Sequence, residues 1–307
     1  MAEKKKIIFD CDTGIDDAVA IVCALYNPDL DILGFTCVNG NVPLANTSRN
    51  TLDLVRYLGF DTPVARGAAA PLYLRRDEHA PEIHGRTGLG DLQLPESQDS
   101  FYDLGAIEMI WQSAQRYPGE LEILATGPLT NIAIALLLHP ELEQLVKHIW
   151  FMGGAIAGGN IVPAAEFNIR IDPEAAHKVI TSSIPTTMVG LDATLKSTLT
   201  YEEIEAIRQI GTPASDVVSR LMDFTMARCE AQGNDCALHD AMTLAAFLGV
   251  DCIKTESYFV DVECQGNYTF GHTYCVKTQK PNCQVAVDGN TREFANWVYE
   301  SLLRSRL

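Results

Sequence analysis

Four aspartates crowd into residues 10–17, directly after the apolar run Ile7-Ile8-Phe9. They are Asp10, Asp12, Asp16 and Asp17, within the sequence DCDTGIDDA. Like charges repel, and burying a carboxylate without a partner is costly. Asp16 and Asp17 alone would be interpreted as residues that cap a helix. Because a cap cannot use all four carboxylates, the cluster favours a bound hard cation with oxygen ligands, Ca²⁺ or Mg²⁺.

Two histidines could move a proton near this cluster. His239 and Asp240 precede an apolar helical run, residues 241–248. Asp240 could complete a metal shell, and His239 could deliver a proton near neutral pH. Seen alone, the pair is more often a helix cap beside an incidental histidine. His84, in the loop sequence IHGRTGLG, is a second substrate contact or acid, or else a surface histidine; the spacing leaves both open.

Alternating strand and helix patterns predict how these residues are brought together. The predicted strands are 6–9, 30–38, 63–65, 121–125, 148–152 and 185–189, and the helices between them are 16–26, 44–58, 106–117, 129–138 and 173–181. This rhythm predicts an α/β fold with an open, mostly parallel central sheet flanked by helices. Further predictions are helices within 200–248, strands near 256–263 and 283–287, and a helix at 292–303. The stretch 67–103 is predicted to be irregular, and therefore functional or mobile.

Ligands of such sheets bind beyond the carboxyl ends of the strands. Polar residues follow several predicted strands there, and Gly-rich turns between them allow close approach. Glu166, Asn160 and Asn168 offer hydrogen bonds to hydroxyl groups, although ordinary polar loops would look the same. Met152 could form the floor of a pocket or pack in the core. The converging set comprises the four aspartates with Asn39, Asn41, Thr126, Asn160, Glu166, Asn168 and Asp192.

The composition excludes some classes of partner. The 307 residues carry a formal net charge of −17, which argues against nucleic acid and fits an anionic membrane surface poorly. Nine cysteines, with no Cys-x-x-Cys pair, indicate neither a zinc site nor a disulfide framework. The apolar runs are too short for a signal peptide or a membrane span. We therefore expect a cytoplasmic protein, and the absence of a linker or repeat predicts one domain over residues 1–307.

A set of motifs resembles the inosine-uridine-preferring nucleoside hydrolases. The first is Asp-x-Asp-x-Gly-x-Asp-Asp after the first strand. The others follow in family order along most of the chain: VNGN at 38–41, IHG at 83–85, TGPLTNIA at 126–133, MGGAIAGGN at 152–160, AEFNIRIDPEAA at 165–176 and HDA at 239–241. The resemblance implies a Rossmann-like α/β fold, a tightly bound Ca²⁺ and hydrolysis of the N-glycosidic bond of ribonucleosides to base and ribose.

The resemblance also implies roles for single residues. Asp12 would act as general base on a metal-bound water, and Asp10 would orient its neighbours. His239, with His84 second, would protonate or hydrogen-bond the leaving base. The implied Ca²⁺ ligands are the carboxylates of Asp12, Asp17 and Asp240 and the backbone carbonyl of Thr126. The implied substrate contacts are Asp16, Asn41, Met152, Asn160, Glu166, Phe167, Asn168 and His239, of which Asp16, Asn41, Asn160, Glu166 and Asn168 would hold the ribose hydroxyls.

The segment expected near the nucleobase differs from that of some family members, which carry tyrosines on the helix before the His-Asp pair. This chain has Phe224 there and no tyrosine. Ala241 after the pair resembles pyrimidine-preferring bacterial members, which favours uridine and cytidine, with inosine as a further substrate. The resemblance also implies a homo-oligomer, a dimer or tetramer.

Two other functions compete with nucleoside hydrolysis. Haloacid-dehalogenase-like Mg²⁺ phosphatases also begin with Asp-x-Asp after a strand, but their motif lacks the following Gly-x-Asp-Asp, here Gly14, Asp16 and Asp17. A catalytically inactive, Ca²⁺-stabilised nucleoside-binding protein would lack a metal ligand or a sugar contact, and none is missing. Both features favour the enzyme.

Overall fold

The strand β1 (Lys5–Cys11) explains why the sheet is covered on both faces. Ile7, Ile8 and Phe9 are fully buried. Because successive side chains of a strand point to opposite faces, Ile7 and Phe9 join one hydrophobic cluster and Ile8 joins the other. A continuous apolar run is the pattern of a strand buried on both sides. These observations come from a computed structural model, which describes residues 4–73, 79–232 and 236–306.

Nine strands of the described chain form one sheet, in the order β3-β2-β1-β4-β5-β6-β9-β7-β8. The strands from β3 to β9 in this order pair in parallel, whereas β7 pairs antiparallel with both β9 and β8. The predicted α/β fold with a mostly parallel sheet is therefore confirmed. Besides β1, the strands are β2 (Leu30–Cys37), β3 (Val64–Arg66), β4 (Glu122–Ala125), β5 (His148–Met152), β6 (Thr186–Val189), β7 (Ile253–Val262), β8 (Thr273–Val276) and β9 (Cys283–Gly289).

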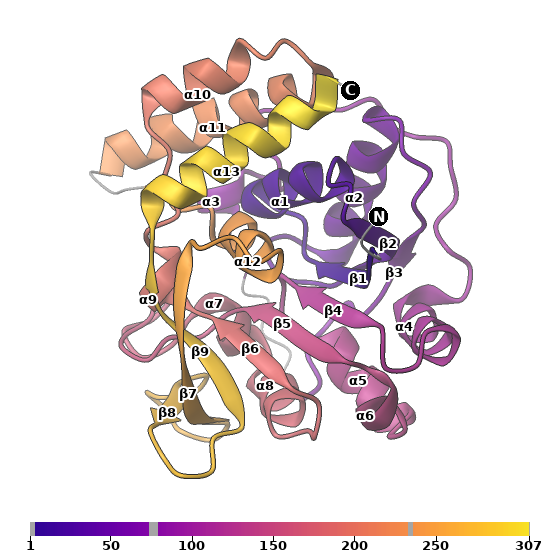
Figure 1. Cartoon of the computed structure of the whole chain (residues 1–307), viewed down its shortest axis with the longest axis vertical. Coiled ribbons are helices and arrows are strands. Elements are labelled where there is room, and N and C mark those ends of the chain that lie inside the picture. The colour runs from indigo at the N-terminus through magenta and orange to yellow at the C-terminus, as the bar shows by residue number, and fades with distance from the viewer. Residues whose placement is uncertain (1–3, 74–78, 233–235, 307) are drawn as a thin grey trace.

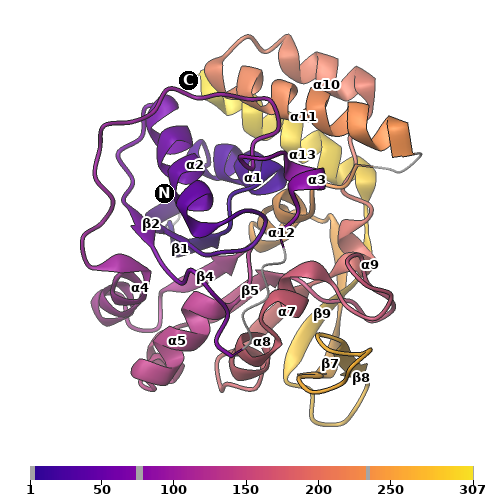
Figure 2. The same cartoon turned by 180° about the vertical axis from the view of Figure 1, so that it is seen from behind.

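Helices cover the two faces of the sheet (Figures 1 and 2). One face carries α1 (Ile15–Leu25), α2 (Leu44–Tyr57) and α12 (His239–Phe247), with α10 (Tyr201–Arg208), α11 (Pro213–Gln232) and α13 (Thr291–Leu303) outside them. The other face carries α4 (Gly105–Arg116), α5 (Thr130–Leu138) and α8 (Pro173–Ile180). No helix in the described ranges has both the length and the hydropathy to cross a membrane.

Several short elements were not predicted. They are the helices α3 (Pro81–His84), α6 (Leu142–Leu145), α7 (Phe167–Ile171) and α9 (Leu191–Thr194), the 3₁₀ turn η1 (Arg304–Arg306), and the strand β8. Each spans three to five residues, which is too short for a hydrophobic period to stand out. The helix α3 lies within the stretch predicted to be irregular, 67–103, of which 74–78 are outside the described residues. Residues 233–235 of the predicted helical stretch 200–248 are outside them too.

The chain reverses its direction of travel across the sheet beside β1. This strand pairs with β2 on one side and with β4 on the other. The loops after β1 and β4 therefore leave neighbouring strand ends toward opposite parts of the molecule, which opens a crevice between them. The aspartate cluster follows β1 and Thr126 follows β4, so the topology places both at this crevice.

The cysteine prediction was wrong at one position. Cys229, near the end of α11, is joined by a disulfide bond to Cys236, just before α12. The two residues are seven positions apart in the sequence, so the pair has no Cys-x-x-Cys spacing. The other seven cysteines are free.

Counting thiols tests this disulfide. We expect the denatured, unreduced chain to react with seven equivalents of a thiol reagent, and the reduced chain with nine. A Cys229→Ser variant has eight cysteines, and its Cys236 has lost its disulfide partner. It should therefore show eight reactive thiols with or without reductant. Nine thiols in the unreduced wild-type chain would show that the bond does not form.

Candidate active site

Three carboxylates meet at the N-terminal ends of α1 and α12. Oxygen atoms of Asp16, Asp17 and Asp240 all lie within 4.8 Å of one another. Asp17 and Asp240 are buried, and the side chain of Asp16 is 15% exposed. Such a group of hard oxygen donors suits a divalent cation. Asp16, which the family resemblance placed at the sugar, therefore belongs to the same group as the predicted ligands Asp17 and Asp240.

Asp17 is fixed by donors from three segments. The backbone N–H of Gly14 and the Nδ2 of Asn41 donate to its Oδ2, at 2.9 and 3.1 Å. The hydroxyl of Thr126 donates to its Oδ1 at 2.7 Å. An acidic residue in the first turn of a helix is also stabilised by the helix dipole. These contacts connect the loops after β1, β2 and β4 at one carboxylate.

Asp12 is fully buried and does not line the pocket. Its Oδ2 accepts a hydrogen bond of 2.7 Å from the backbone N–H of Asn41, while its Oδ1 has no partner among the described residues. Two glycines make room for it: a Cβ at Gly40 would lie 2.0 Å from Oδ2, and one at Gly127 would lie 2.9 Å from Oδ1. A buried, partnerless carboxylate oxygen at this position fits a cation ligand.

Burial and mutual repulsion raise the pKa values of the clustered carboxylates. Burial, followed by the charge of Asp17, raises the pKa of Asp16 to about 7 and that of Asp12 well above its usual range. Burial and the charges of Asp16, Asp17 and Asp12 raise the pKa of Asp240 strongly as well. Since these carboxylates cannot all ionise unaided, a divalent cation would offset their charge. The donor set therefore fits a metal.

Asp10 differs from its neighbours because it belongs to β1 and does not line the pocket. Its Oδ1 accepts from the hydroxyl of Thr36 on β2 at 2.5 Å and from the Nδ2 of Asn131 on α5 at 2.8 Å. Burial raises its pKa to about 7, although both donors oppose the shift. These bonds link β1 to β2 and to α5, and the orienting role of Asp10 stays a prediction.

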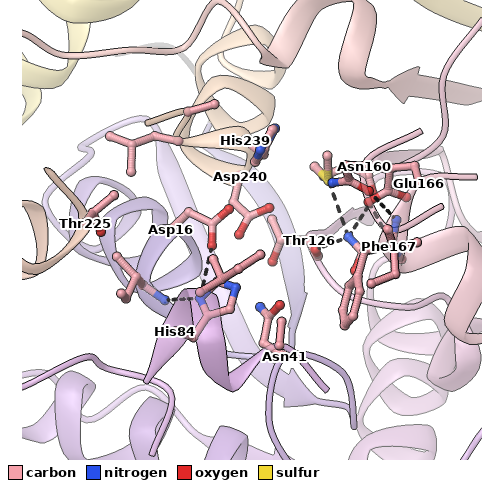
Figure 3. Close-up of a pocket in the computed structure, with 18 of the residues that line it drawn as sticks. Asp16, Asn41, His84, Thr126, Asn160, Glu166, Phe167, Thr225, His239 and Asp240 are labelled. Atoms are coloured by element: carbon pink, nitrogen blue, oxygen red, sulfur yellow. Dashed lines mark hydrogen bonds and ion pairs between the residues drawn. The ribbon is translucent and has the colours of Figure 1, made fainter. Parts of the chain in front are cut away.

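A pocket of about 520 Å³ opens above the carboxylates (Figure 3). This volume suits a small organic ligand. Eleven of the thirteen residues predicted for the site line it, while the fully buried Asp12 and Asp17 do not. The eleven are Asp16, Asn41, His84, Thr126, Met152, Asn160, Glu166, Phe167, Asn168, His239 and Asp240.

The wall opposite Asp16 and Asp240 is built around α7 (Figure 3). Glu166 caps this helix, and its carboxylate accepts from the backbone N–H groups of Asn168, Ile169 and Gly154. The Nδ2 of Asn168 donates to the carbonyl of Thr126 at 2.7 Å, which ties the wall to β4. Burial raises the pKa of Glu166 while these donors oppose the shift. The wall is therefore rigid and rich in hydrogen-bond acceptors.

Asn160 and Phe167 complete this wall. The Oδ1 of Asn160 accepts from the backbone N–H of Phe167 at 2.9 Å. Asn160 is exposed, whereas Phe167 is buried beside Ile171 and Ala80. Met152, at the end of β5, is buried with Ala155 and Leu191, so it both packs in a small cluster and lines the pocket.

The two candidate histidines are neutral and held through Nδ1. The backbone N–H of Ile15 donates to Nδ1 of His84 at 3.0 Å. Burial lowers the pKa of His84 to about 3, helped by the charge of Arg228, and burial lowers the pKa of His239 to about 4. Near pH 7 each ring therefore carries one proton, and each can donate or accept only one hydrogen bond at its other nitrogen.

Some lining residues were missed from the sequence. Thr225 and Arg228 reach the pocket from α11, and Leu195 and Ile161 contribute partly exposed apolar side chains. They carry no motif, and only the departure noted near Phe224 pointed to this segment. Asp192, expected to converge on the site, does not line the pocket; it accepts from the backbone N–H of Ile156 and so supports the Gly-rich loop.

Comparison with known proteins identifies the family. The family model described as inosine-uridine preferring nucleoside hydrolase matches residues 7–296. The chain belongs to this nucleoside hydrolase family. It is thus a nucleoside hydrolase, as the motifs predicted, and not a haloacid-dehalogenase-like phosphatase.

The relatives of this nucleoside hydrolase differ in their described substrates. The pyrimidine-specific ribonucleoside hydrolase RihA of Citrobacter koseri is 41% identical over 304 residues, covering 96% of this chain and 97% of the relative. A solved purine-preferring ribonucleoside hydrolase from Gardnerella vaginalis superimposes with a TM-score of 0.93 at 33% identity, covering 99% of this chain and 100% of that one. A plant nucleoside hydrolase, PpNRh1, superimposes with a TM-score of 0.92 at 31% identity, covering 97% of this chain and 99% of that one. The shared fold therefore does not decide which base is preferred.

Proposed function

We propose that this nucleoside hydrolase cleaves the N-glycosidic bond of ribonucleosides, in a Ca²⁺-dependent reaction that gives free base and ribose. The observation that carries the proposal is the partnerless Oδ1 of Asp12, buried among carboxylates at the base of a pocket lined by hydrogen-bond acceptors and two histidines. Family membership supports the reaction class.

The proposed ligands of Ca²⁺ are the carboxylates of Asp12, Asp17 and Asp240 and the carbonyl of Thr126. Ca²⁺ takes six to eight oxygen ligands in flexible geometry, which this crowded donor set suits better than the strict octahedron of Mg²⁺. When bound, the ion lowers the pKa of water and orients hydroxyl groups. Asp16 lies close enough to contact both the ion and a substrate hydroxyl.

Asp12 is the proposed general base. Its Oδ1 is free to take a proton from a water molecule, while the N–H of Asn41 holds Oδ2 in place. Asp10 lies two positions earlier, within β1, and its Oδ1 accepts two hydrogen bonds, so it suits orientation rather than proton transfer. General base catalysis requires such a positioned acceptor.

The sugar side of the pocket suits a developing positive charge. Cleavage of a ribosyl bond gives the sugar oxocarbenium character. Asp16, Asn41, Asn160, Glu166 and Asn168 place carboxylate and amide groups around the pocket, where they can bind the ribose hydroxyls. Fixed dipoles and charges of this kind stabilise a transition state because they need not reorganise.

The leaving base must be hydrogen-bonded as the bond breaks. His239 is the proposed donor, and His84 is the second. Because both rings are neutral near pH 7, each would act through an N–H group rather than as an imidazolium. Met152 and Phe167 supply apolar surface beside the substrate.

We further propose a preference for pyrimidine nucleosides, uridine and cytidine. The support is Ala241 after the His-Asp pair and the 41% identity to a relative described as pyrimidine-specific. A cytoplasmic homo-oligomer, a dimer or tetramer whose protomer is one domain over residues 1–307, is also part of the proposal. Gel filtration with light scattering would give the number of chains.

Ribose release tests the proposed function. We expect release from uridine and cytidine, slower release from inosine and adenosine, and loss of all four activities after exhaustive chelation. Added Ca²⁺ should restore them. Release from purine nucleosides alone would contradict the base preference, and no release with Ca²⁺ bound would leave the nucleoside-binding alternative. In that case a nucleoside should still raise the melting temperature.

A further inference from the structure

His239 has a hydrogen-bond partner that no motif indicates. Its Nδ1 lies 2.8 Å from the hydroxyl of Thr194, at the end of the short helix α9. Thr194 is fully buried, and within the described chain its Oγ1 makes no other hydrogen bond. The two residues are 45 positions apart in the sequence, so only the fold brings them together.

The backbone around this pair is tied together. The N–H of Leu238 donates to the carbonyl of Ser197 at 2.8 Å, and Thr198 forms an isolated bridge with Ala237. These bonds link the segment after Thr194 to the segment before His239. The hydroxyl is thus presented to the imidazole by a fixed frame, which is the requirement for a residue that orients another.

The single proton of the hydroxyl decides the direction of the bond. If Nδ1 of His239 carried the ring proton, Thr194 would accept it and its own buried proton would have no acceptor, which is costly. If Thr194 donates, its proton is satisfied and Nδ1 is the acceptor. The neutral ring then carries its proton on Nε2. This nitrogen makes no hydrogen bond to a described residue, although His239 lines the pocket (Figure 3).

His84 provides a comparison inside the same pocket. Its Nδ1 accepts from the backbone N–H of Ile15, a group that can only donate. Its proton must therefore also be on Nε2 when the ring is neutral. The two histidines reach the same state by different means, and only the partner of His239 is a side chain that a substitution can remove.

We infer that Thr194 is a positioning residue, which holds His239 in the tautomer that presents Nε2–H to the leaving base. This inference deepens the proposed function and rests on it for the identity of the acceptor, a carbonyl oxygen or ring nitrogen of the departing base. Thr194 does not line the pocket, so its effect on the base would pass through the ring.

The substitution Thr194→Val tests the inference, because valine keeps the branched shape and removes the hydroxyl. We expect kcat for the nucleoside that the wild type cleaves fastest to fall about tenfold or more, with KM changed less than about threefold. For p-nitrophenyl riboside, whose leaving group needs no hydrogen bond, kcat should fall less than about threefold. Thr194→Ser keeps the donor and should restore kcat to within about threefold of the wild type.

Thr243→Val is the matched control. Thr243 is equally buried, and its hydroxyl donates to the backbone carbonyl of His239 rather than to the ring. We expect this variant to treat both substrates as the wild type does. The loss of kcat in His239→Ala on the nucleoside gives the largest loss that Thr194→Val could cause through the ring. Equal losses on both substrates for Thr194→Val, or none on either, would overturn the inference.

A measurement without substrate separates this inference from the proposed function. In protein labelled with ¹⁵N-histidine, two-bond ¹H–¹⁵N correlations report which ring nitrogen carries the proton. We expect His239 to show protonated Nε2 in the wild type and in Thr194→Ser, and a mixture of tautomers in Thr194→Val. His239→Ala assigns the signal. Protonated Nδ1 in the wild type would overturn the inference even if ribose is released, and the expected tautomers would support it even if none is.

Discussion

Replacing Asp12 by alanine should lower ribose release by about a thousandfold or more, because the substitution removes both the proposed general base and one proposed ligand of the cation. The Oδ1 of Asp12 is buried and has no hydrogen-bond partner among the described residues, as is also true of Asp10 Oδ2 and Asp16 Oδ1. Asp17 is poorly placed to replace it, since hydrogen bonds hold both of its carboxylate oxygens. The measurement is kcat on uridine at saturating Ca²⁺, together with Ca²⁺ affinity by calorimetry.

A companion variant separates lost chemistry from lost structure. Asp12→Asn keeps the size and can still accept from the N–H of Asn41. It removes one of several repelling charges, so the metal-free variant should melt at the same temperature as the metal-free wild type or higher. Asp251→Ala, at an exposed aspartate, should leave activity unchanged. Near-normal turnover by either Asp12 variant would remove this residue as the base.

Much of the site could be predicted because the sheet rule converts sequence position into spatial position. Asp12, Asn41 and Thr126 each follow a strand that the sequence predicts. Because these strands are parallel, their carboxyl ends lie at the same edge of the sheet. The Gly-rich turns were visible in the sequence, although only the structure shows that Gly40 and Gly127 leave no room for a side chain next to Asp12.

The remainder depends on contacts between distant segments. Asp16 and Asp240 come together because α1 packs beside α12, and no spacing in the sequence measures that approach. The same holds for the bond between Thr194 and His239 and for the disulfide of Cys229 and Cys236. Short helices such as α7 and α9 were missed because one turn of helix has no hydrophobic period, yet they carry Glu166 and Thr194 into place.

Removal of the cation should both inactivate and destabilise the enzyme, and the destabilisation should grow with pH. In the metal-free fold, burial raises the pKa of the proposed ligands Asp12, Asp17 and Asp240 above their ordinary value, and raises that of Asp16 from 3.8 to about 7. A group whose folded pKa is raised contributes stability that is present below its unfolded pKa and is lost as pH rises through the folded value. The metal-free protein should therefore lose stability between about pH 4 and pH 8 through this cluster.

Bound Ca²⁺ would reverse that trend, because the ion stabilises the ionised carboxylates and must displace protons at low pH. The gap in melting temperature between Ca²⁺-loaded and metal-free protein should consequently be wider at pH 8 than at pH 5.5.

His84 and His239 act in the opposite direction: their lowered pKa values destabilise the fold as pH falls below their unfolded value. Since both forms contain these histidines, comparing the gap rather than either melting temperature removes the part of their contribution that the cation does not change. The metal-free protein should be prepared by chelation at neutral pH and then exchanged into each buffer, because chelators bind Ca²⁺ weakly in acid. A gap that stays constant or narrows as pH rises would mean that the ion does not bind the ionised cluster, and the proposed ligand set of Asp12, Asp17 and Asp240 would have to be abandoned.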